Sequence, residues 1–268
     1  MPDRVLDLSL GRPVQPAAGT LVLSASRVRD FLVCPRKFFL AHVLKVPAHD
    51  RDTDASAHGR AIHYELFLRH QTHELHDSPE LVAHDIAPDP FVVSRVRAHQ
   101  LLCPLTSPPT SGDAPRYLGG EVDLRWLIRS KNVLLTGRAD ALWLYPDGTL
   151  EVRDYKSGHC PDSLHSDLPA SIYLLLAAAH SHRPDPQAGP ATPIRPTRVR
   201  VAYERLGPTP AVIAVDGSEE LVSQAVNNVR DFADRIRKEK HFVATASDQN
   251  CASCAYSDIC PASVAKGT

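Results

Sequence analysis

The sequence predicts an α/β fold in which a mixed central sheet is flanked by helices. Three observations predict it. Apolar residues recur at helical spacing before about residue 103, the stretch 118–155 is rich in β-branched and aromatic residues, and two more strand-like segments lie between helical ones after it. Helices and strands in this order pack in layers around one central sheet.

The N-terminal part of the chain is predicted to be helical after a loose arm over residues 1–20, which show no sustained periodicity. Ser24 is expected to cap a helix over Ser26–Leu44. Pro35 interrupts that helix just after Cys34, because proline cannot continue the helical hydrogen bonds. Two further helices are predicted over 57–76 and 89–103, and the Pro/Ser/Gly stretch 104–115 is expected to be a loop.

Strands and helices alternate in the rest of the chain. Strands are expected over 118–128, 133–145 and 149–155, and Asp147-Gly148 predicts a tight hairpin turn between the last two. A helix over 168–182 and a proline-rich loop over 183–196 follow. The predicted order ends with strands over 198–206 and 211–215, a helix over 217–240 and a cysteine-rich tail.

Composition excludes several classes of protein. With 268 residues, 43% hydrophobic and 23% charged, the chain has enough apolar material for a core, so disorder of the whole chain is excluded. No run approaches the length of a membrane-spanning helix, and the N-terminus lacks the apolar stretch of a secretory signal, so we expect a cytoplasmic protein. The net charge of -1 excludes coating of nucleic acid by bulk charge, but not a local basic groove.

A possible catalytic group lies on the predicted hairpin. Asp154 and Lys156 project from the same face of one strand, and the Asp147-Gly148 turn brings Asp140 of the preceding strand beside them. Two carboxylates suit a hard divalent cation such as Mg²⁺ or Mn²⁺, and a lysine can orient an attacking water and offset phosphate charge. The alternative is an ordinary surface salt bridge between Asp154 and Lys156.

The segments around Asp140 and Asp154 also occur in an order that is typical of a known family. Gly137-Arg138-Ala139-Asp140, the Asp-Gly turn and Asp154-Tyr155-Lys156-Ser157-Gly158 resemble the PD-(D/E)XK nuclease superfamily, in its RecB-like branch. Gly59-Arg60-Ala61-Ile62-His63 matches the G-x-x-[IV]-H helix of that branch. The resemblance covers about residues 21–262 and implies a restriction-endonuclease-like core.

The resemblance also implies roles for individual residues. His63, Asp140 and Asp154 would ligate the metal, the Tyr155 backbone carbonyl would add a ligand, and Lys156 would be the catalytic lysine. Glu121 stands where some members have an additional acidic residue, although an ordinary strand-edge charge is an equal alternative.

One departure from the family pattern concerns the helix that follows the lysine. The branch has Q-x-x-x-Y there. Tyr173 fits the tyrosine, but Pro169 replaces the glutamine, which puts the DNA-contacting role of this helix in doubt. Tyr173 could equally be a core aromatic residue.

The six cysteines are unevenly placed, and three of them crowd the C-terminus. Cys251, Cys254 and Cys260 have a metal-site spacing but are one short of four ligands, and Cys34 is the best candidate for the fourth. In four-cysteine members of the branch, such as the AddB nuclease domain and the CRISPR-associated RecB-like exonucleases, one N-terminal and three C-terminal cysteines hold a 4Fe–4S cluster. The resemblance implies this cluster here, and spacing alone leaves a Cys₄ zinc site open. Cys103 and Cys160 are expected to be buried or incidental thiols.

A cluster that joins the two ends of the chain argues for one nuclease domain over 21–262, with a tail over 263–268. Basic residues near the predicted site are candidates for contacts to DNA phosphates. They are Arg27, Arg29, Arg36, Lys37, Arg138, Arg153, Arg198, Arg200 and Arg205.

The sequence therefore predicts a metal-dependent DNA nuclease, expected to be an exonuclease on single-stranded or end-bearing DNA in repair, recombination or defence. The alternative is a non-catalytic nucleic-acid-binding or structural subunit of a helicase–nuclease complex with a zinc-stabilised Cys₄ site. Because the chain has no Walker A loop, any helicase activity must come from a separate partner.

Overall fold

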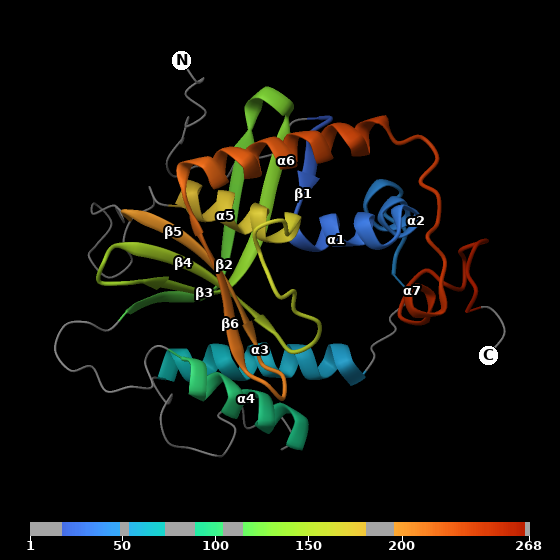
Figure 1. The fold of residues 1–268 in the computed structure, drawn as a ribbon. Coiled ribbons are helices and arrows are strands. Elements are labelled where there is room, and N and C mark those ends of the chain that lie inside the picture. The colour runs from blue at the N-terminus through green and yellow to red at the C-terminus, as the bar shows by residue number, and fades with distance from the viewer. Residues whose placement is uncertain (1–17, 49–53, 73–88, 104–114, 181–195, 266–268) are drawn as a thin grey trace.

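The fold was analysed in a computed structural model that describes residues 18–48, 54–72, 89–103, 115–180 and 196–265 (Figure 1). Most of the predicted N-terminal arm and of the loops over 104–115 and 183–196 lie outside these residues, as does the end of the tail. No helix in the described part of the chain is long and apolar enough to cross a membrane.

A six-stranded mixed sheet forms the centre of the fold and confirms the predicted class. Its strands are β1 (Leu21–Leu23), β2 (Arg116–Ile128), β3 (Val133–Leu144), β4 (Thr149–Lys156), β5 (Arg198–Arg205) and β6 (Ala211–Gly217). They follow the order β1-β3-β4-β5-β6, and β2 pairs with β3. The pairs β1/β3 and β4/β5 are parallel, and the other three pairs are antiparallel.

Strand β3 organises the sheet because it pairs with three other strands. β2 runs along it from Val133 to Leu144. On the opposite edge, β1 pairs with its first residues, Val133–Leu135, and β4 pairs with its last, Ala141–Leu144. The pairing of Ala141 with Arg153 puts Asp140 level with Asp154, as the Asp-Gly turn predicts. Asp140 therefore lies where the strands on this edge of β3 diverge.

The helices cover both faces of the sheet (Figure 1). α3 (Asp54–Thr72) and α4 (Pro90–Leu102) lie together on one side. α1 (Ala25–Val33), α5 (Leu168–His180) and α6 (Glu219–Lys238) pack on the other. Two short helices, α2 (Pro35–Phe38) and α7 (Asp248–Ala252), lie near each other beyond the end of α1.

The predicted interruption at Pro35 is confirmed. The side-chain oxygen of Ser24 accepts a hydrogen bond from the Arg27 backbone N–H at 3.2 Å, so α1 starts one residue earlier than predicted. The helix ends at Val33, Cys34 is extended, and Pro35 opens α2, where its missing N–H costs nothing. A π-helical turn over Phe39–Val43 follows.

Two apolar cores fix the sheet between its helices. The larger core joins the sheet to α1, α5 and α6. The smaller one packs Ile62 and Leu66 of α3 and Val96 of α4 against Trp143 and Tyr155. This smaller core holds α3, and with it His63, against the strands that carry the predicted catalytic residues.

Candidate active site

His63 lies between two oxygen atoms of the central strands. Its Nδ1 is 3.1 Å from Asp140 Oδ1, and its Nε2 is 3.2 Å from the Tyr155 carbonyl oxygen. The other carboxylate oxygen of Asp140 accepts a hydrogen bond from the Tyr155 backbone N–H. Helix α3 and strands β3 and β4 thus bring together three of the predicted metal-binding groups.

Glu121 joins this group from strand β2. Ligand atoms of His63, Glu121 and Asp140 all lie within 4.8 Å of one another. Glu121 has a positive φ of 52°, a conformation that costs free energy for a residue with a side chain and persists where the surrounding structure requires it. Glu121 therefore lies beside two of the predicted metal ligands, and it also pairs with Arg138.

Asp154 and Lys156 form an ion pair on the face of β4 that points away from α3. The Lys156 ammonium also lies 4.5 Å from the centre of the Tyr203 ring. Among the described residues, Asp154 is outside the 4.8 Å group of His63, Glu121 and Asp140. The structure thus puts the two carboxylates level on adjacent strands but directs Asp154 toward the lysine.

The pKa shifts of the site reflect its negative charge. Burial of the His63 imidazole opposes protonation, but the hydrogen bond to Asp140 and the charges of Asp140, Asp154 and Glu121 outweigh it and raise the pKa of His63. Burial raises the pKa of Asp140, and the nearby Asp154 carboxylate raises it further against the hydrogen bonds from His63 and Tyr155. Carboxylates gathered this closely repel one another, and a bound cation relieves that repulsion.

A surface cleft opens directly over this group. It is lined by Gly59, Arg60, His63, Tyr64, Phe67, Glu121, Arg138 and Asp140. Arg60 and Arg138 are exposed, and Arg138 Nη1 lies 3.3 Å from Glu121 Oε2. The lining of the cleft therefore combines carboxylate oxygens with guanidinium groups that suit phosphate.

The family model described as "PD-(D/E)XK nuclease superfamily" matches residues 22–261. The chain belongs to the PD-(D/E)XK nuclease superfamily. Comparison with curated proteins gives no match.

Two solved structures are similar to this superfamily member at low sequence identity. SSO0001 is 16% identical with a TM-score of 0.39, over 95% of this chain and 90% of that one. A "Putative exonuclease" from Eubacterium rectale is 11% identical with a TM-score of 0.44, over 85% of this chain and 86% of that one.

Tyr173 and Pro169 both lie on α5, as predicted, and both are buried. The Tyr173 hydroxyl donates a hydrogen bond to the Arg138 carbonyl at 3.1 Å, so the ring packs beneath the Gly137–Asp140 segment. Pro169 occupies the first turn of α5, where proline is tolerated. The Asp167 side chain accepts a hydrogen bond from the Ala170 N–H at 2.9 Å and so caps this helix.

The four cysteines of the predicted cluster line one cavity. Cys34 comes from the junction of α1 and α2, and Cys251, Cys254 and Cys260 come from α7 and the turns after it. Two contacts hold these distant segments together. Asn250 Nδ2 donates to the Val33 carbonyl at 3.5 Å, and the Tyr256 hydroxyl donates to the Val46 carbonyl at 3.3 Å.

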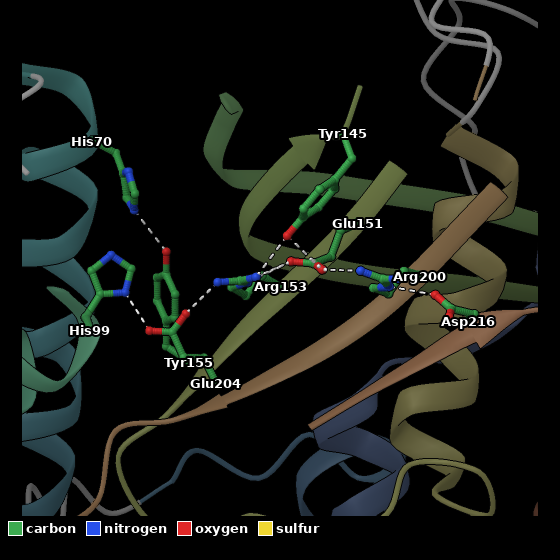
Figure 2. Close-up of polar contacts among 9 residues, drawn as sticks. All are labelled: His70, His99, Tyr145, Glu151, Arg153, Tyr155, Arg200, Glu204 and Asp216. Atoms are coloured by element: carbon green, nitrogen blue, oxygen red, sulfur yellow. Dashed lines mark hydrogen bonds and ion pairs between the residues drawn. The ribbon is translucent and has the colours of Figure 1, made fainter. Parts of the chain in front are cut away.

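The hypothesis that Arg153 contacts DNA is wrong. Its side chain is 3% exposed and forms ion pairs with Glu151 at 2.7 Å and Glu204 at 2.9 Å (Figure 2). The residue precedes Asp154 on β4 and therefore points to the opposite face, toward α3 and α4. Strand alternation was the signal in the sequence that places Arg153 on the face opposite Asp154.

The other basic residues that were predicted to contact DNA differ in their exposure and in their ion pairs. Arg29 and Arg198 are exposed. Lys37 pairs with Asp30 at 2.8 Å, and Arg200 pairs with Asp216 at 2.6 Å. Arg27, Arg36 and Arg205 are partly buried.

Cys103 and Cys160 are both buried thiols, as expected. Cys103 has neighbours that sequence reasoning missed, since ligand atoms of His70, His99 and Cys103 lie within 4.8 Å of one another. The signal in the sequence was the spacing of His99 and Cys103, four residues apart, which puts both on one side of a helix.

Proposed function

We propose that this chain is a metal-dependent DNA nuclease of the RecB-like branch, which hydrolyses phosphodiester bonds. The observation that carries the proposal is the convergence of His63, Glu121 and Asp140 in the lining of one cleft. The Tyr155 carbonyl contacts His63, and the Asp154–Lys156 pair lies on the same strand as Tyr155. An imidazole nitrogen and several oxygens fit Mg²⁺ or Mn²⁺.

The residues of the site have different roles in the proposed reaction. A bound divalent cation would polarise a phosphoryl oxygen of the scissile phosphate. His63, Glu121, Asp140 and the Tyr155 carbonyl would hold that cation, and Asp154, whose charge acts on both His63 and Asp140, would be a further ligand. Lys156, oriented by Asp154 and by the Tyr203 ring, orients the attacking water and offsets the charge that develops on the phosphate.

The proposed substrate is single-stranded or end-bearing DNA, held through its phosphates. Arg60 and Arg138 at the cleft supply charge-assisted hydrogen bonds to phosphate oxygens. The proposed mode is exonucleolytic, in repair, recombination or defence, with a helicase supplied by a separate protein where unwinding is required.

We also propose a 4Fe–4S cluster at Cys34, Cys251, Cys254 and Cys260, which ties the two ends of a single nuclease domain over 21–262. The shared cavity of these cysteines supports it. A Cys₄ zinc site is the alternative for the same four ligands.

The nuclease proposal is tested by incubating end-labelled single- and double-stranded DNA with the protein and Mg²⁺ or Mn²⁺. We expect metal-dependent degradation, and its loss in Asp154→Asn and Lys156→Ala. Asp162→Asn, which changes a fully exposed carboxylate, is the matched control and should cleave as the wild type does. Full cleavage by both site variants would refute the assignment.

A further inference from the structure

Three buried side chains meet behind strand β4, on the side of α3 and α4. His70 belongs to α3, His99 belongs to α4, and Cys103 follows the last turn of α4. Their exposed fractions are 3%, 0% and 3%. Ligand atoms of the three lie within 4.8 Å of one another, which is close enough for one metal ion to bridge them.

Both imidazole rings are oriented from behind by a hydrogen bond. His99 Nδ1 lies 2.6 Å from Glu204 Oε1, and His70 Nε2 lies 3.1 Å from the Tyr155 hydroxyl (Figure 2). His99 Nε2 is buried, and Cys103 interacts with the same imidazole. A histidine held by a carboxylate through one nitrogen, with its other nitrogen directed at a cluster of ligands, is the usual arrangement of a metal-binding histidine.

A buried carboxylate also contacts the group directly. Glu204 lies between His99 and Arg153, at 2.6 Å from the first and 2.9 Å from the second. A carboxylate in this position favours positive charge at the group.

We propose that His70, His99 and Cys103 form a further metal site, which takes Zn²⁺. Two imidazole nitrogens and a thiolate suit this borderline-soft ion, whereas Mg²⁺ prefers the oxygens of the active-site cleft. The role of the ion is structural. It links α3 to α4 and supports Tyr155 from behind, at a position that no substrate reaches because all three ligands are buried.

This site does not depend on the proposed nuclease function. Its ligands are separate from the cleft residues, so a chain without nuclease activity could still bind the metal here. The test accordingly measures metal content and not DNA cleavage.

The test is metal analysis of the full chain, purified with Zn²⁺ and then freed of loosely bound metal with a weak chelator. The wild type, Cys103→Ser and Cys160→Ser are compared. Cys160 is the matched control, because it is also a buried cysteine but lies outside the group. We expect Cys103→Ser to bind one zinc fewer per chain than the other two proteins, whatever zinc the four-cysteine cavity retains. Equal zinc in all three would overturn the proposal.

X-ray absorption at the zinc edge of the wild type keeps the proposal testable if Cys103→Ser does not fold. For this measurement the four-cysteine cavity is loaded with iron in the absence of oxygen, so that it does not contribute zinc. We expect a mixed nitrogen and sulfur environment with a single sulfur. Absence of zinc, or a zinc surrounded by sulfur alone, would refute the site.

Discussion

Neighbouring residues of β4 serve opposite faces of the sheet. Asp154 and Lys156 point to one face and form the ion pair beside the active site. Arg153 and Tyr155 point to the other, where they contact Glu204 and His70. Four consecutive residues therefore combine the proposed catalytic pair with the buried polar contacts that fix the strand to α3, α4 and β5.

Arg153 is expected to matter for stability. Arg153→Met leaves Glu151 and Glu204 buried without their common partner, so we predict a loss of about 3–5 kcal/mol in the free energy of unfolding. Urea denaturation measures it. Arg198→Met, a change at an exposed arginine of the neighbouring strand, should stay within about 0.5 kcal/mol of the wild type. Equal stability of the two variants would show that the buried ion pairs contribute little.

At the scale of elements, the packing of α5 on β3 depends on a glycine. A Cβ atom at Gly137 would lie 2.7 Å from Leu176 Cδ1 and 3.2 Å from Tyr173 Cε1. The glycine of the Gly-Arg-Ala-Asp motif thus allows the helix to approach the strand that carries Asp140.

Gly137→Ala should therefore push α5 away from β3. We predict a destabilisation of about 1–3 kcal/mol, as for other overpacked cores. Gly158→Ala is the control, because a Cβ there has no neighbour within 4 Å. Thermal unfolding of both variants checks the prediction, and a Gly137→Ala protein as stable as Gly158→Ala would contradict it.

The helices and strands that can be predicted from the sequence are those long enough to show a hydrophobic periodicity. Strands β2 to β6 and the longer helices have enough residues for their periodicity to be read, and the Asp-Gly turn fixes the register of Asp140 and Asp154. β1 has three residues and α7 has five, which is too few for either period to be recognised.

The site residues also divide into those that a local sequence pattern predicts and those that it does not. His63, Asp140, Asp154 and Lys156 could be placed from motif order and hairpin register. The group of His70, His99 and Cys103 could not, because it depends on how α3 packs against α4, and no local pattern determines that packing. Strand alternation places Arg153 on the face opposite Asp154, but its basic character suggested contact with phosphate instead.

For the whole molecule, the cysteine cavity joins segments that are more than 200 residues apart in sequence, as the contact between Asn250 and Val33 shows. A cluster in this cavity would contribute its binding free energy to folding. The two ends of the chain would then unfold together with the sheet.

We predict that Cys34→Ser loses iron and acid-labile sulfide when purified without oxygen, and that its thermal unfolding midpoint falls. Cys160→Ser, again a buried cysteine outside the cavity, should keep the brown colour and the midpoint of the wild type. Iron analysis and calorimetry measure both. A colourless wild type that contains four-sulfur zinc would refute the cluster, and an unchanged midpoint in Cys34→Ser would refute its contribution to folding.

Helix α3 contacts Tyr155 through two histidines seven residues apart, His63 at the backbone carbonyl and His70 at the phenol hydroxyl. One tyrosine therefore lies between the nuclease site and the buried histidine–cysteine group. Its amide, which donates to Asp140, is a natural spectroscopic reporter. A nitrogen-15 label at this single residue would register the filling of either site in the same spectrum.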